Sequence, residues 1–132
     1  MNKIRHNIYL GSWQPATKLE ELKSAAITAV LNVALDQNDP DFFNEGITNV
    51  KVGLGDCDYN KPHIKQLAID VLGKILDAGE VVYVNCIAGA SRSPYVVGKY
   101  LAHKEGKTLQ TLITELHQMR PEVFERSPLH DE

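Results

Sequence analysis

The chain of 132 residues is predicted to be an α/β protein in which helices flank a mostly parallel central sheet of four to five strands. Two observations lead to this prediction. Short apolar runs alternate with longer segments of helical periodicity, and no internal repeat or low-complexity segment interrupts them. A polar, glycine-containing segment also follows the last apolar run, where the carboxyl end of a parallel strand is expected to carry a functional site.

The strands are expected at four apolar runs, residues 8–10, 29–33, 49–52 and 81–85. The clearest helix is expected over residues 62–77, where apolar side chains recur at helical spacing and Gly79 ends the run. A second helix is expected over residues 92–103 and a third over residues 108–119, which Pro121 closes. Shorter helices are expected at residues 17–23 and 40–44.

Length and composition favour one domain over residues 1–132. The formal net charge is −3, from 14 Lys and Arg against 17 Asp and Glu, and there is no polybasic run, so neither nucleic acid nor an anionic membrane is an expected partner. No stretch approaches a membrane span, and residues 1–5 lack the apolar core of a signal peptide. With only two cysteines, we expect a cytoplasmic protein, and a monomer.

The segment from Cys86 to Pro94 lies between the last predicted strand and a predicted helix. Its residues between Cys86 and Arg92 are small except for Ile87, so the backbone can curl until its N–H groups point inward and bind a tetrahedral anion. A helix that begins near Ser91 to Ser93 would direct its positive end at the same point and favour the thiolate of Cys86. The planar guanidinium of Arg92 can hold two phosphate oxygens at once.

A cysteine after an apolar strand is, taken alone, commonly an inert core thiol. Here it is followed by an arginine and several polar N–H groups, an arrangement with little structural use beside a buried sulfur. The segment is therefore predicted to be a nucleophile with an anion clamp. The predicted phosphate-binding residues are Ile87, Ala88, Gly89, Ala90, Ser91 and Arg92.

These residues resemble the signature of the dual-specificity phosphatases, the compact branch of the cysteine-based protein tyrosine phosphatases. That signature is His-Cys-x-x-Gly-x-x-Arg-Ser/Thr, and the chain matches it from Cys86 to Ser93. The runs at residues 8–12 and 27–33 are similar to the first two strands of that family, and residues 119–121 are similar to the end of its final helix. Low molecular weight phosphatases also carry Cys-x5-Arg-Ser-Pro, but near their N-terminus, with the acid far downstream.

The resemblance implies a phosphatase fold and a hydrolase of phosphorylated proteins or peptides, on tyrosine and on serine or threonine, that needs neither metal nor other cofactor. It places the general acid at Asp56, with Asp58 as the rival. Cys86 would be the nucleophile and Arg92 would stabilise the phosphoryl oxygens. Ser93 would assist the departing thiolate or cap the helix. Trp13, Tyr59 and Phe124 are candidates for the pocket entrance.

One position departs from the family pattern, because Asn85 replaces the histidine before the nucleophile. An amide can donate a hydrogen bond but carries no positive charge, so we expect the Cys86 thiolate to be less favoured than is usual for the family. A second hypothesis concerns Cys57, which adjoins the candidate acid. It could form a reversible disulfide with Cys86 or be a buried spare thiol.

Two other classes of protein stay open at this stage. A catalytically silent phosphate-binding module would keep Arg92 and the loop amides, and Asn85 is the feature that favours it. A sulfur-transfer or arsenate-reducing enzyme could also use a cradled thiolate, but it would need thiol partners that a chain with two cysteines scarcely supplies.

Overall fold

The computed structural model of the chain describes residues 1–56 and 59–130. In these residues five strands form one sheet in the order β1-β2-β5-β3-β4. Only the pairing of β1 with β2 is antiparallel. The strands are β1 (Asn2–Arg5), β2 (Ile8–Gly11), β3 (Ala29–Ala34), β4 (Thr48–Leu54) and β5 (Val82–Asn85). The mostly parallel sheet expected from the sequence is confirmed.

The α-helices are α1 (Leu19–Ser24), α2 (Pro62–Asp77), α3 (Arg92–Glu105) and α4 (Leu109–Met119). Helix α1 lies in the connection from β2 to β3 and α2 in that from β4 to β5, whereas α3 and α4 follow the last strand. Single 3-10 turns occur at Gln14–Thr17 and Phe43–Glu45. The N-cap of α4 is Thr108, whose hydroxyl accepts a hydrogen bond from the backbone N–H of Thr111 at 3.1 Å. The predicted long helices therefore form close to their expected bounds.

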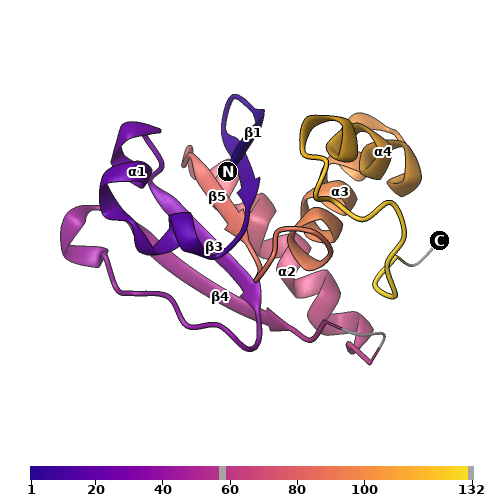
Figure 1. The fold of residues 1–132 in the computed structure, drawn as a ribbon, viewed down its shortest axis with the longest axis horizontal. Coiled ribbons are helices and arrows are strands. Elements are labelled where there is room, and N and C mark those ends of the chain that lie inside the picture. Colours follow the sequence, from indigo (N-terminus) through magenta and orange to yellow (C-terminus); the bar gives the residue numbers. More distant parts are fainter. Residues whose placement is uncertain (57–58, 131–132) are drawn as a thin grey trace.

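The sheet lies between α1 on one side and α2, α3 and α4 on the other (Figure 1), and an apolar cluster packs on each of its faces. Side chains of a strand alternate between its faces, so Leu31 and Val84 join the larger core under α2, α3 and α4, while Val30 and Tyr83 face α1. The central strands β3 and β5 are thereby covered on both faces and are buried along their whole length, whereas the edge strands β1 and β4 are partly exposed.

The register of the parallel strands brings polar residues together at one edge of the sheet. Asn85 at the end of β5 lies opposite Gly11 on one side and Asn32 on the other. The loop that follows Asn85 therefore begins at the carboxyl end of the central strand.

The structure corrects the sequence predictions at three places. Strand β1 was not expected, because its sequence Asn-Lys-Ile-Arg is polar and only Ile4 is buried. The helix expected over residues 40–44 is instead the 3-10 turn Phe43–Glu45, and the carboxylate of Asp41 accepts a hydrogen bond from the N–H of Phe43 at 2.9 Å. The helix expected over residues 17–23 is divided into the turn at Gln14–Thr17 and α1.

No helix within residues 1–56 and 59–130 combines the length and the apolar character needed to cross a bilayer.

Candidate active site

The sequence-predicted nucleophile and clamp lie at the two ends of one loop, residues 86–92, between β5 and α3. Cys86 follows β5 directly and is 2% exposed, and Arg92 is the first residue of α3 and is 3% exposed. A guanidinium at that depth requires hydrogen-bond partners or a bound anion.

Every carbonyl of residues 86–91 accepts a hydrogen bond from a group outside the loop or on its flanks. The carbonyl of Cys86 accepts from Asn85 Nδ2 (3.3 Å) and that of Ile87 from the N–H of Trp13 (3.1 Å). Arg120 donates to the carbonyls of Ala88 through Nη2 (2.9 Å) and of Gly89 through Nε (3.0 Å). The carbonyl of Ala90 accepts from the N–H of Phe124 (2.8 Å) and that of Ser91 from the N–H of Tyr95 (3.0 Å). The carbonyl oxygens are thus drawn away from the centre of the loop.

This arrangement fixes the direction of the loop amides. In a trans peptide the C=O of one residue and the N–H of the next point in opposite directions, and no cis peptide bond occurs in the described residues. The N–H groups of residues 87–92 therefore point to the side opposite the carbonyl partners, and none of them donates to another described residue. A ring of converging N–H groups at the N-terminus of a 14-residue helix favours a bound anion.

Gly89 is required by the curvature of the loop. Its φ is +67°, in the left-handed region that favours glycine. A Cβ atom there would also lie 2.4 Å from the backbone carbon of Gly11 and 2.8 Å from Arg120 Nη2. The loop consequently packs directly on the end of β2.

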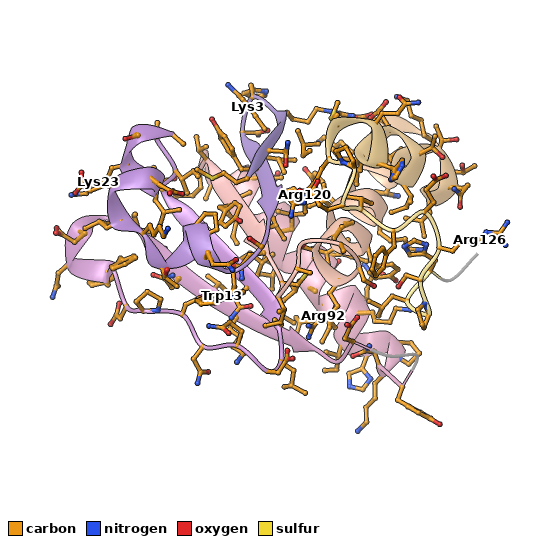
Figure 2. The ribbon with its side chains drawn as sticks, viewed as in Figure 1. Lys3, Trp13, Lys23, Arg92, Arg120 and Arg126 are labelled. Carbon is orange, nitrogen blue, oxygen red and sulfur yellow. The ribbon has the colours of Figure 1, made fainter. Side chains whose placement is uncertain are left out.

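Arg120 binds two carbonyls of the loop, whereas sequence reasoning placed it only at a helix terminus. It is 6% exposed, and besides Ala88 and Gly89 its guanidinium contacts Asn2 Oδ1 at 3.0 Å through Nη1. Figure 2 shows Arg120 and Arg92 within the molecule, whereas Arg126 lies at its edge. The signal in the sequence was an arginine at the end of an amphipathic helix, which on its own does not distinguish a buried brace from a surface charge.

The hydroxyl of Ser93 lies 3.2 Å from the sulfur of Cys86, and Ser93 is fully buried. The N-cap residue of α3 is Ser91, not Ser93. Ser91 contacts the hydroxyl of Ser127 instead of the sulfur. Of the two sequence-based interpretations of Ser93, the geometry therefore favours the contact with sulfur over helix capping.

Asp36, which the sequence did not indicate, forms an ion pair with Arg92. Nη1 of Arg92 donates to Asp36 Oδ1 at 2.7 Å and to the carbonyl of Leu54 at 2.9 Å. The hydrogen bond from Arg92 holds the pKa of Asp36 below its ordinary value.

Asp56 lies two residues beyond the end of β4 and is exposed. The side-chain amide of Asn60 exchanges two hydrogen bonds with the backbone of Gly55, both at 2.7 Å, and so closes the segment that carries Asp56. Asp58 and Cys57 lie outside the described residues. The choice between the two aspartates and the proposed Cys57–Cys86 disulfide stay predictions.

Seven of the nine predicted site residues line one pocket of about 230 Å³, and the other two, Gly89 and Ser93, do not line it. Its walls are Asp36, Asp56, Cys86, Ile87, Ala88, Ala90, Ser91, Arg92 and Phe124. Three aromatic residues were candidates for the entrance of this pocket. Phe124 lines the pocket and is 57% exposed, whereas Tyr59 is 88% exposed and does not line it. Trp13 donates its backbone N–H to the loop.

A larger hollow of about 900 Å³ between α2 and α3 contains none of the predicted site residues.

Asn85, in the position of the family histidine, is fully buried. Its Nδ2 lies 3.4 Å from Asn32 Oδ1, and Asn32 in turn donates to the carbonyl of Gln37 at 2.6 Å. The Oδ1 atom of Asn85 has no hydrogen-bond partner among the described residues. An amide pair across β3 and β5 thus occupies the space beneath the nucleophile.

The fold and the loop define a class of compact α/β domains in which a Cys-x5-Arg segment joins a central parallel strand to a helix. The family model described as "Dual specificity phosphatase, catalytic domain" matches residues 8–131. The chain therefore belongs to the dual-specificity phosphatase family.

Individual relatives agree with this assignment. The chain is 32% identical over 120 residues to dual specificity protein phosphatase 1 of Arabidopsis thaliana, covering 89% of this chain and 59% of the relative. It is 36% identical over 121 residues to protein-tyrosine-phosphatase IBR5 of the same plant, covering 86% of this chain and 42% of the relative. The chain thus spans less than two thirds of the length of these two relatives.

The crystal structure of human DUSP28 superposes with a TM-score of 0.84 at 22% identity, covering 98% of this chain and 90% of that chain. This likeness shows the fold. The match to a catalytic-domain model favours an enzyme over the silent phosphate-binding module that Asn85 had left open.

Proposed function

We propose that the chain hydrolyses phosphomonoesters through a phosphocysteine intermediate and that residues 1–132 form one catalytic domain for this reaction. One observation carries the proposal. Cys86, Arg92 and Asp56 line a single pocket, and the carbonyls of the loop between the first two are all bound by other groups. A phosphoryl group placed there would meet a nucleophile, an anion clamp and a proton donor together.

In the first step the thiolate of Cys86 attacks phosphorus in line with the ester oxygen. The sulfur–phosphorus bond forms while the phosphorus–oxygen bond breaks, and Asp56 gives its proton to the departing oxygen. The amides of residues 87–92 and the guanidinium of Arg92 stabilise the charge on the three equatorial oxygens.

In the second step water attacks the phosphocysteine and Asp56 takes a proton from it. The sulfur–phosphorus bond breaks, inorganic phosphate is released and the electron pair stays on sulfur. Ser93 Oγ, 3.2 Å from that sulfur, donates a hydrogen bond to the departing thiolate. The enzyme returns to its starting state without metal or cofactor.

We infer that the substrates are phosphorylated proteins or peptides, on tyrosine and on serine or threonine. Three small or apolar side chains of the loop, Ile87, Ala88 and Ala90, line the pocket. Lysine does not occur in the loop, so a highly charged head group gains no extra contact there. The net charge of −3 and the lack of a polybasic run support a protein that binds neither nucleic acid nor an anionic membrane, and we propose that it is a cytoplasmic monomer.

Hydrolysis of p-nitrophenyl phosphate, followed as released inorganic phosphate, tests the proposal. The wild type should turn over and be inhibited by vanadate, whereas Cys86→Ser should lose at least about a thousandfold in kcat. Equal rates for the two proteins would identify a silent binding module. Release of no phosphate by a folded wild type, together with reduction of arsenate or transfer of sulfur, would overturn the hydrolase.

The acid is tested with a substrate whose leaving group needs a proton. On phenyl phosphate, Asp56→Asn should lower kcat by about 100-fold or more, and on p-nitrophenyl phosphate by less, because p-nitrophenolate leaves without protonation. A larger loss for Asp58→Asn would assign the role to Asp58.

A further inference from the structure

The guanidinium of Arg92 binds protein groups through Nη1 alone among the described residues. Both protons of Nη1 are used, one by Asp36 Oδ1 at 2.7 Å and one by the carbonyl of Leu54 at 2.9 Å. Nε and Nη2 donate to no other described residue. The edge formed by Nε and Nη2 is the side-on fork that binds two oxygens of a phosphate.

The segment that presents Asp36 is held firmly in place. The ammonium of Lys51 on β4 lies 3.2 Å from the carbonyl of Leu35, 2.9 Å from that of Gln37 and 3.2 Å from Asn38 Oδ1. On β3, the buried Asn32 donates to the carbonyl of Gln37 at 2.6 Å and accepts from the N–H of Ala34 at 2.9 Å. Asp36 is 63% exposed, but the backbone on both sides of it is fastened.

The carbonyl of Leu54 connects this segment to Arg92. It accepts one hydrogen bond from the N–H of Leu35 at 3.0 Å and another from Arg92 Nη1 at 2.9 Å. The ion pair is therefore part of a braced junction where β3, β4 and α3 meet.

We propose that Asp36 is a positioning residue for phosphate binding: it fixes Nη1 of Arg92 so that the Nε and Nη2 edge is turned toward the phosphoryl group. The inference rests on the proposed function of the site. Asp36 acts through Arg92 and is not assigned a contact with the substrate.

The same carboxylate has a second, opposite effect, because it lines the pocket and repels a phosphate dianion. Two variants separate the effects. Asp36→Asn keeps an oxygen that accepts the hydrogen bond and removes the charge, whereas Asp36→Ala removes both. Positioning therefore predicts that the two variants differ.

The kinetic experiment measures kcat and KM for a phosphotyrosine peptide. Asp36→Ala should lower kcat/KM by about tenfold or more, mainly through kcat, because a mobile guanidinium stabilises the transition state less well. Asp36→Asn should keep kcat within about twofold and lower KM. Equal kcat values for wild type, Asp36→Ala and Asp36→Asn would overturn the proposal, and so would equal losses in the two variants.

Two further proteins complete the design. Lys51→Met removes the brace without touching Arg92 and should lower kcat in the same direction as Asp36→Ala, with the double variant no worse than Asp36→Ala alone. Asp41→Asn, an exposed carboxylate in the same connection, should behave as wild type. Additive losses for Lys51 and Asp36 would contradict the shared role. If the wild type itself releases no phosphate, the proposed function fails, and this outcome is distinct from a difference among active variants.

Discussion

Cys86 and Ser93 are seven residues apart, yet their side chains meet beneath the loop, with sulfur and hydroxyl oxygen 3.2 Å apart. The contact arises because Cys86 directly follows β5, and Ser93, in the first turn of α3, lies next to it after the loop. Both side chains are buried, so the hydroxyl has no bulk water to compete for its hydrogen bond.

Ser93→Ala should slow the second chemical step more than the first, because only that step leaves a full negative charge on sulfur. We expect kcat to fall about 10- to 100-fold with p-nitrophenyl phosphate, and a burst of p-nitrophenol before the steady state. Rapid mixing measures both. Ser91→Ala is the matched control, since the Ser91 hydroxyl contacts Ser127. A Ser93→Ala protein with wild-type turnover and no burst would assign Ser93 a packing role only.

Gly89→Ala and Gly106→Ala form a matched pair, because both glycines have φ near +66°. Each variant should lose about 1 kcal/mol in free energy of unfolding from the left-handed backbone. Only at Gly89 does the new Cβ meet other atoms, the nearest 2.4 Å away, whereas nothing lies within 4 Å at Gly106. Urea denaturation should show a larger loss for Gly89→Ala, and vanadate affinity should fall in that variant alone. Equal effects of the two substitutions would mean that the loop has room to adjust.

Arg120 holds two carbonyls of the loop with a planar fork, so Arg120→Lys should not replace it. We expect Arg120→Ala to lower the free energy of unfolding by about 2–4 kcal/mol and to weaken vanadate binding, with Arg120→Lys in between. Thermal unfolding and vanadate titration measure the two effects. Arg126→Ala, at an exposed arginine, is the control. If Arg120→Ala is as stable as Arg126→Ala, the contacts of Arg120 do not stabilise the loop.

Asp39, near Asp36 in the chain, gives a dependence of stability on pH. Burial raises the pKa of Asp39 to about 6, while the nearby Lys51 lowers it. A raised pKa means that the folded state binds more protons than the unfolded state between about pH 4 and 6, so Asp39 reduces stability as the pH rises through that window. Asp39→Asn should therefore stabilise the protein by about 1–2 kcal/mol at pH 7.5 and have little effect at pH 3.5.

Chemical denaturation of wild type and Asp39→Asn at the two pH values measures this difference. Asp41→Asn, at an exposed carboxylate, is the control. A stabilisation by Asp39→Asn of the same size at both pH values would show that the carboxyl group does not titrate in this window.

Residues whose local sequence determines both their element and their position were predictable. The alternation of apolar runs and helical segments indicated the sheet, and the loop was recognised because Cys86, Gly89 and Arg92 fall between a strand and a helix. Edge strand β1 was missed because an edge position tolerates polar side chains and leaves little periodicity to detect.

The partners that complete the loop were not predictable in the same way. Asp36 meets Arg92 across 56 residues of sequence, and Arg120 reaches Ala88 across 32. Such contacts depend on how β3, β4 and α4 pack, and an exposed aspartate or a helix-terminal arginine has no local pattern that reveals a distant partner. The Asn85–Asn32 contact likewise follows from the register of two strands.

We expect Phe124 to give the site a preference for aromatic over aliphatic phosphate esters. Its backbone N–H donates to the carbonyl of Ala90 at 2.8 Å, which places the exposed ring beside the pocket. Other wall residues include Asp36 and Asp56, which are polar, so a phosphotyrosine ring is expected to pack on Phe124.

Phe124→Ala should therefore raise KM for a phosphotyrosine peptide by about 2- to 10-fold, the range given by 0.5–1.5 kcal/mol of aromatic packing. For the same peptide with phosphoserine, KM should change by less than about twofold, because the shorter side chain does not reach the ring. Tyr59→Ala is the control, since Tyr59 is 88% exposed and does not line the pocket. Equal increases in KM for the two peptides would indicate that Phe124 supports the loop through packing and does not select the substrate.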